Sequence, residues 1–397
     1  MSTYQIIGIL YAIVGVITVG ALVYERSKHK TFDLNYLPIT GTLILVTRLL
    51  VGALFIYSGF VKANDYIGFA YKLEEYFTIF GDRWPAFEGF FSLFVPLAEP
   101  MAWFIAVFEV ALAIALILGW KMNLTAWLTM IMMVFFTILT GYSHFTGSVT
   151  DCGCFGDALK IEPWESFVKD IILTFMLIPL FLVRKSIYAF PNSKIAGIIT
   201  AAVFVITGIF SWYCHENLPM IDFRAYKVGK DLKICTTEMT VDGYPKCKDW
   251  FFIDEENYLI DRYTLLPEDD STRIKSGKAY QIEPVNPFSG VTLMIVTYNV
   301  TKASPEAMKA SGDLGRALAG SGVNVLGATS TGPSSMEETY IPEYQLDYPF
   351  TFMDETVLKT IVRSHPGYVL LKEGVILKKW HQNNIPSAEE VKSLAGI

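Results

Sequence analysis

Residues 43–61 read LILVTRLLVGALFIYSGFV, a run of nineteen residues with a single charge at Arg48. A helix needs about 20 apolar residues to cross the hydrocarbon core of a membrane, so this run predicts a transmembrane span. Five more runs of this kind occur before residue 217. The six expected spans cover residues 4–23, 43–61, 103–119, 124–141, 167–183 and 195–212. The first has no basic leader and no small-residue cleavage site, so we expect a retained helix.

The chain has 397 residues, of which 52% are hydrophobic, and a formal net charge of −7. The apolar excess lies in the first half of the chain, and the remainder has the composition of a soluble domain. The negative charge argues against nucleic acid as a partner.

Basic residues indicate the orientation of the spans. They occur in the loops after the first, third and fifth spans, at Arg26, Lys28, Lys30, Lys121, Arg184, Lys185 and Lys194. If successive spans alternate in direction, these loops lie on one side, which the positive-inside rule assigns to the cytoplasm. Both termini are then outside. We therefore expect a multi-pass protein of a bacterial inner (plasma) membrane with a periplasmic C-terminal domain.

Two cysteines one residue apart, Cys152 and Cys154, follow the fourth span on the expected outer side. A disulfide between them would close a small, strained ring, and strain makes a disulfide easier to reduce. Gly153 supplies backbone freedom for that ring. A redox role is one interpretation, and a structural disulfide or half of a metal site are the others. Because no partners at metal-ligand spacing occur nearby, we expect no metal.

The other three cysteines also fall on the outer side. Cys235 and Cys247 flank a turn-rich loop, where they form either a structural disulfide or a second redox pair that relays electrons to the first. Cys214 lies at the outer end of the sixth span, either as a resolving thiol or as a buried cysteine of a helix end.

Charges in or near the spans are candidates for quinone or proton handling, because charges inside a membrane are costly and face the protein interior. Arg48 lies near the cytoplasmic end of the second span, Lys62 at its outer end, and Glu109 about six residues into the third span. Depth favours a Glu109–Lys62 pair over Glu109–Arg48. The pair either exchanges protons with a quinone or is purely structural. His144 is either another proton carrier or a surface residue.

Five segments are expected along the chain. They are a transmembrane anchor (1–36), a four-helix membrane domain (37–190), a transmembrane tether (191–217), a cysteine-containing outer segment (218–289) and an α/β domain (290–397). A stretch at 71–77, within the outer loop of the membrane domain, is amphipathic and is expected at the membrane interface.

Alternating buried strands and capped helices define the last domain. Strands are expected at 291–298, 323–329 and 350–353, helices at 304–321, 355–362 and 388–395, a helix or loop at 334–344, and a hairpin of strands 367–372 and 374–380. This order predicts an α/β sandwich. Two further β-like runs, 250–253 and 258–263, precede it.

The membrane domain resembles a known family. Arg48, Gly52, Ser58-Gly59, Lys62 and the trailing Gly68-Phe69-Ala70 are similar to the first segment of the DoxX/DoxD superfamily. Together with Cys152-Gly153-Cys154-Phe155-Gly156, they are most similar to its methylamine-utilisation MauE branch, over roughly residues 40–185. The resemblance implies a four-helix membrane protein associated with disulfide formation in an exported enzyme subunit, and with quinone-linked chemistry.

Residues 290–397 resemble the thioredoxin-like fold, in which His365-Pro366-Gly367 occupies the place of the cis-proline. The loop 298–304 stands where that family carries C-x-x-C, and it has no cysteine. The resemblance therefore implies a degenerate domain that docks partners.

Two functional hypotheses follow. In the first, the chain is a thiol-disulfide oxidoreductase that exchanges electrons between exported protein thiols, or a thioredoxin-like partner, and membrane quinone through Cys152 and Cys154. In the second, it is a non-catalytic membrane scaffold with structural disulfides. The sequence names neither the client nor the direction of electron flow.

Overall fold

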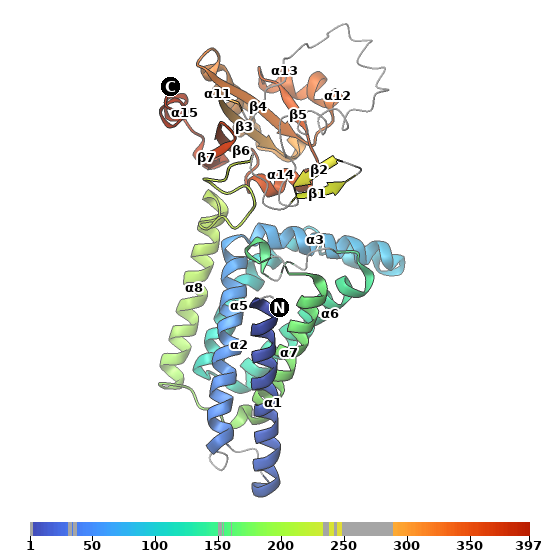
Figure 1. Cartoon of the computed structure of the whole chain (residues 1–397), viewed down its shortest axis with the longest axis vertical. Coiled ribbons are helices and arrows are strands. Elements are labelled where there is room, and N and C mark those ends of the chain that lie inside the picture. The colour runs from blue at the N-terminus through green and yellow to red at the C-terminus, as the bar shows by residue number, and fades with distance from the viewer. Residues whose placement is uncertain are drawn as a thin grey trace. The chain divides into compact units, whose positions relative to one another are not determined.

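The computed structural model of the chain describes residues 3–30, 34, 38–149, 153, 155–159, 161–232, 238–241, 244–247 and 289–397. It contains two compact units, Met1–His215 and Glu216–Ile397 (Figure 1).

The first unit is a helical bundle. Its helices are α1 (Thr3–His29), α2 (Pro38–Asn64), α3 (Tyr66–Arg83), α4 (Glu88–Ser92), α5 (Ala98–Leu118), α6 (Met122–Thr146), α7 (Pro163–Val183) and α8 (Ser193–Asn217). Six of them are long and apolar enough to cross a membrane: α1, α2, α5, α6, α7 and α8. All six expected spans are thereby confirmed as helices, and the chain is a multi-pass membrane protein.

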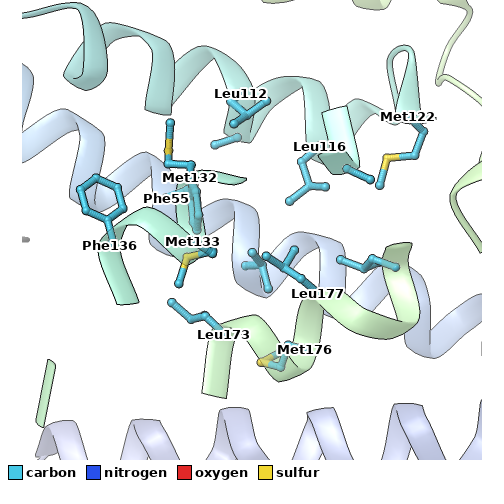
Figure 2. Close-up of a cluster of buried hydrophobic side chains, with 14 of the residues drawn as sticks. Phe55, Leu112, Leu116, Met122, Met132, Met133, Phe136, Leu173, Met176 and Leu177 are labelled. Atoms are coloured by element: carbon cyan, nitrogen blue, oxygen red, sulfur yellow. The ribbon is translucent and has the colours of Figure 1, made fainter. Parts of the chain in front are cut away.

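Small residues let α2 and α5 approach each other closely. A Cβ atom at Gly59 would lie 2.7 Å from Val110 Cγ2, and one at Gly52 would lie 2.4 Å from Ile117 Cγ1. Close backbone approach at small residues is the usual way in which membrane helices associate. Side chains of α2, α5, α6 and α7 pack together in a hydrophobic core that includes Phe55, Met133 and Leu173 (Figure 2).

Helix α3 runs across one end of the bundle, steeply inclined to the spans (Figure 1). Asp65 caps its first turn by accepting a hydrogen bond from the Gly68 amide at 3.1 Å. Tyr76 and Ser143 of α6 join their hydroxyls at 2.5 Å in a buried contact. The amphipathic stretch expected at 71–77 lies within this helix, and its buried face covers the ends of α2 and α5.

The second unit contains a mixed five-stranded sheet. Its strands are β3 (Val291–Thr297), β4 (Val323–Thr329), β5 (Phe350–Phe352), β6 (Gly367–Lys372) and β7 (Val375–His381), in the order β5-β4-β3-β6-β7. Strands β3, β4 and β5 are parallel, whereas β6 is antiparallel to both β3 and β7. The expected parallel pair and the hairpin are confirmed, and β5 extends the parallel part.

Helices cover both faces of this sheet. Apolar residues of one face pack with α11 (Pro305–Leu318) and α15 (Ala388–Ala395), and those of the other face pack with α14 (Glu355–Ile361). Ser304 and Ser387 cap α11 and α15, as the sequence predicts. The stretch left as helix or loop consists of three short helical turns, α12 (Pro333–Ser335), the π-helical η6 (Met336–Tyr340) and α13 (Ile341–Tyr344).

The segment after α8 belongs to the second unit. Asp231 bridges Val375 in antiparallel fashion, and Tyr226 and Leu232 are buried in the core beside α14. Residues 238–247 carry a short hairpin of β1 (Glu238–Val241) and β2 (Tyr244–Cys247). The β-like runs at 250–253 and 258–263 lie outside the described residues.

Candidate functional site

A small cavity lies inside the bundle, between α2, α5, α6, α7 and the loop that precedes α7. Its lining residues are Leu54, Phe55, Ser58, Lys62, Glu109, Met133, Phe136, Phe155, Lys169, Asp170 and Leu173. The space open to the centre of a water molecule is ≈ 20 Å³. A single water needs about 10–15 Å³ by this measure, so the cavity has room for water but not for a larger ligand. Figure 2 shows four of its apolar lining residues, Phe55, Met133, Phe136 and Leu173.

A buried ion pair forms one wall of the cavity. Lys62 Nζ lies 2.8 Å from Glu109 Oε2, and the two side chains are 1% and 3% exposed. The ammonium also donates to Ser58 Oγ at 2.6 Å and lies 4.9 Å from the centre of the Phe136 ring. The carboxylate, the hydroxyl and the aromatic ring together compensate the buried ammonium of Lys62, as burial of a charge requires. The Glu109–Lys62 pairing favoured by depth is confirmed.

The depth of Glu109 differs from the expected six residues. Helix α5 begins at Ala98, so Glu109 lies eleven residues along it, or about 16 Å at 1.5 Å per residue. Lys62 is the third-last residue of α2, which ends at Asn64. The C-terminal end of α2 therefore lies beside the middle of α5.

A second ion pair lines the same cavity. Asp170 of α7 is 1% exposed, and its Oδ1 lies 2.8 Å from Lys169 Nζ. Its other oxygen accepts a hydrogen bond from the Thr140 hydroxyl of α6 at 2.9 Å. The Lys169 side chain is 22% exposed, and its ammonium lies 4.9 Å from the centre of the Phe155 ring. Two lysines and two carboxylates therefore face one small volume.

The loop that carries the first cysteine pair lies next to this cavity. Gly153 is buried with a φ of +68°, and a Cβ there would approach Lys72 Cγ of α3 to 3.1 Å. Phe155 is 4% exposed and lines the cavity, and a Cβ at Gly156 would contact Val61 of α2 at 3.5 Å. Gly153 thus lies against α3, and Phe155 and Gly156 lie against the C-terminal part of α2. Cys152, Cys154 and Cys235, and the side chain of Cys247, lie outside the described residues.

Other residues predicted for the site lie elsewhere in the bundle. Arg48 donates to the carbonyl oxygens of Leu116 and Ile117 at 3.0 and 2.6 Å, at the C-terminus of α5. Leu116 is seven residues after Glu109 in α5, so the Arg48 contact lies about 10 Å along the helix from Glu109. His144 is half-buried among aromatic rings near the end of α6, 4.9 Å from Trp164 between ring centres. Cys214 is buried in α8.

Sequence reasoning missed Asp170 and its partners Lys169 and Thr140. The clue was present, since Asp170 is a carboxylate within an otherwise apolar expected span, as Glu109 is. The same rule that intramembrane charges face the interior would have included it.

The second unit carries a notable group at the end of β3. The ring of His365 lies against that of Tyr298 at a tilt of 32°, with 4.0 Å between centres, and its Nε2–H donates to the Asn299 carbonyl at 2.6 Å. Burial lowers the pKa of His365 to about 4, although the hydrogen bond to Asn299 acts in the opposite direction. The ring is therefore neutral at neutral pH. The peptide bond between His365 and Pro366, just before β6, is cis.

Comparison with known proteins gives one match. Residues 40–183, which cover most of α2 and all of α3 to α7, match the family model described as methylamine utilisation protein MauE. The membrane part of the chain is therefore similar to that family. Searches of curated proteins and of solved structures found no match.

Proposed function

We propose that this protein is an integral membrane thiol-disulfide oxidoreductase. It exchanges electrons between exported protein thiols, or a thioredoxin-like partner, and quinone dissolved in the membrane, through Cys152 and Cys154. The observation that carries the proposal is the position of Gly153 and Phe155 around Cys154. Phe155 lines a cavity that also holds two lysines and two carboxylates, and Gly153 packs against Lys72 of α3.

The chemistry needs a thiolate and a proton acceptor at the same place. A client thiolate attacks one sulfur of the Cys152–Cys154 disulfide, and a second client thiol resolves the mixed disulfide. The client gains a disulfide, and Cys152 and Cys154 gain two electrons and two protons. Nearby lysines favour the thiolate forms of these cysteines. Lys72, whose stem packs against Gly153, and Lys169, whose ammonium lies 4.9 Å from the centre of the Phe155 ring, are described cations that contact the loop.

Quinone is the substrate that takes two electrons and two protons from the reduced pair. The cavity of ≈ 20 Å³ does not fit a quinone ring. Quinone therefore binds outside the cavity, on the side that faces lipid. Tyr57 is 44% exposed on α2, and its ring lies 5.7 Å from that of Phe155, so it is the nearest aromatic contact from the surface to the loop.

The C-terminal unit, in this proposal, is a thioredoxin-like domain that positions the client on the periplasmic side. The parallel β3–β4 pair joined by α11, the antiparallel β6–β7 hairpin and the final α15 support this assignment. The cis bond before β6 lies beside the loop after β3, which carries Tyr298 and Asn299 and no cysteine. A dithiol is therefore missing where the fold would use one, which favours docking over independent redox chemistry.

Single Cys152→Ser and Cys154→Ser variants test the proposal. We expect each to abolish oxidation of exported client thiols in intact cells while membrane abundance stays unchanged, measured by alkylation of client cysteines and by immunoblot. Cys214→Ser tests the buried cysteine of α8: normal client oxidation would show that it is not a resolving thiol, and a loss would add it to the redox set. If both loop variants oxidise clients normally, the enzyme proposal fails and the scaffold hypothesis takes its place.

A further inference from the structure

Asp170 is a buried carboxylate that the proposed disulfide exchange does not use. It is 1% exposed within the membrane-spanning α7, and both of its oxygens are bonded, one to Lys169 and one to Thr140. Ionisable residues at such positions are costly and tend to have a function. The charged groups around Asp170 indicate what this function is.

Asp170 and Glu109 line the same cavity from different helices. The charged groups that face this volume are Lys62 from α2, Glu109 from α5, and Lys169 and Asp170 from α7. Helix α6 contributes the hydroxyl of Thr140 to Asp170. Two positive and two negative side chains therefore balance in this volume. The ≈ 20 Å³ of free space accommodates a water molecule that can carry a proton.

Lys169 connects this cavity with the cysteine loop. Its ammonium bonds Asp170 and lies 4.9 Å from the centre of the Phe155 ring, and its side chain is partly exposed. By contrast, Lys62 and Glu109 are almost fully enclosed. Asp170 is therefore the carboxylate with the more direct link to the surface.

We propose that Asp170 and Glu109 form one proton-exchange site, served by water in the cavity, for the two protons of the Cys152–Cys154 dithiol. This inference rests on the proposed function. When the dithiol is oxidised, two S–H bonds break, one S–S bond forms, and two electrons and two protons pass to quinone to give quinol. Each carboxylate transiently holds one proton, and Lys169 stabilises Asp170 between transfers.

Asp170→Asn tests the role of the charge with little change in shape, because an amide still accepts the Thr140 hydrogen bond. In purified full-length protein we expect quinone reduction by a dithiol to slow by about 100-fold, the usual contribution of a general acid–base group. Exchange of the Cys152–Cys154 disulfide with dithiothreitol, without quinone, should keep its wild-type rate. Asp170→Glu should restore most of the quinone-dependent rate.

An infrared difference spectrum between the oxidised and the dithiothreitol-reduced protein supplies a readout without quinone. We expect the carboxylate bands of the wild type to shift when the cysteine pair is reduced, and the Asp170 part of this shift to be lost in Asp170→Asn. Thr140→Val, which removes one hydrogen bond to Asp170, should alter that part of the shift. Thr137→Val is the matched control, because the Thr137 hydroxyl bonds only the Met133 carbonyl of its own helix among the described contacts.

The outcomes separate the two claims. If the wild type exchanges thiols and reduces quinone, and Asp170→Asn matches it in rate and spectrum, the proton-exchange inference is refuted and Asp170 is structural. If the wild type itself reduces no quinone, the proposed function fails first.

Discussion

Each unit of this protein buries a lysine against a carboxylate, and the two pairs have different surroundings. In the membrane bundle, Lys62 bonds Glu109 at 2.8 Å on the wall of a cavity. In the C-terminal unit, Lys379 of β7 bonds Asp222 at 2.9 Å, and its ammonium also donates to the Ile361 carbonyl at 2.8 Å. Asp222 additionally accepts from Arg224 Nε at 2.8 Å.

The second pair has an evident structural task. Asp222 and Arg224 belong to the segment after α8, and Lys379 holds this segment on the sheet. Lys62 and Glu109 join α2 to α5, which Gly52 and Gly59 already bring together. A buried ion pair is thus weak evidence of function by itself. An adjoining water-sized cavity, a second carboxylate and a cysteine loop are what distinguish the membrane pair.

Removing the lysine from each pair gives the largest expected difference. Lys62→Met leaves Glu109 buried without its cation, and breaking such a pair costs about 3–5 kcal/mol. Lys379→Met leaves Asp222 bonded to Arg224 but removes the donor to the Ile361 carbonyl, so we expect a smaller loss of about 1–3 kcal/mol. Thermal unfolding of the full-length protein in detergent measures the first, and hydrogen exchange of the β7 amides measures the second. Equal losses would remove the distinction between the pairs.

The double variant Lys62→Met/Glu109→Leu separates stability from chemistry. Apolar replacement of a whole buried pair is often neutral in stability. We therefore expect near-normal unfolding but a loss of client oxidation of about 100-fold. Normal oxidation in the double variant would show that the membrane pair, like the other, is only structural.

Arg48 provides an intermediate effect. Its guanidinium satisfies two carbonyl groups at the C-terminus of α5, where backbone acceptors lack helical partners. Arg48→Leu should cost about 1–3 kcal/mol in unfolding free energy, with unchanged client oxidation per folded molecule. If Arg48→Leu lost client oxidation while its unfolding free energy stayed normal, Arg48 would again be a candidate for quinone or proton handling.

The C-terminal pair also predicts a pH dependence. Burial, together with the nearby Arg224, lowers the pKa of Lys379 to about 7, against about 10.4 in an unfolded chain. Between these values the unfolded chain binds more protons, so this residue makes stability rise with pH from 7 to 10. Hydrogen exchange of β7 amides, compared between wild type and Lys379→Met at each pH, should show a difference that grows across this range. A constant difference would contradict the assignment.

Asp222 acts in the acid range. Burial alone would raise its pKa, but Arg224 and Lys379 lower it to about 2. Its stabilisation is present above about pH 4 and is lost as pH falls toward 2, by about 2 kcal/mol. Asp222→Asn should remove this acid sensitivity in the same exchange measurement.

The sequence predicts most of the fold because its features are local. Apolar runs mark the six spans, and serine caps with alternating strands mark the α/β domain almost to the residue. The Lys62–Glu109 pair was predicted from approximate depth, although Glu109 lies further along its helix than expected. What requires tertiary structure was missed: the acceptors of Arg48 are backbone carbonyls, which a sequence does not display. The bridge from Asp231 to β7 and the cavity that unites Asp170 with Glu109 arise from packing between distant segments.

The central claim is that Cys152 and Cys154 cycle between disulfide and dithiol in step with membrane quinone. The most direct measurement traps their thiols in native membranes with a mass-tagged alkylating agent, with and without respiratory quinone. We expect the reduced pair to accumulate when quinone is depleted and to reoxidise when it is restored. A pair that stays fully oxidised in both conditions would contradict the claim and identify a structural disulfide.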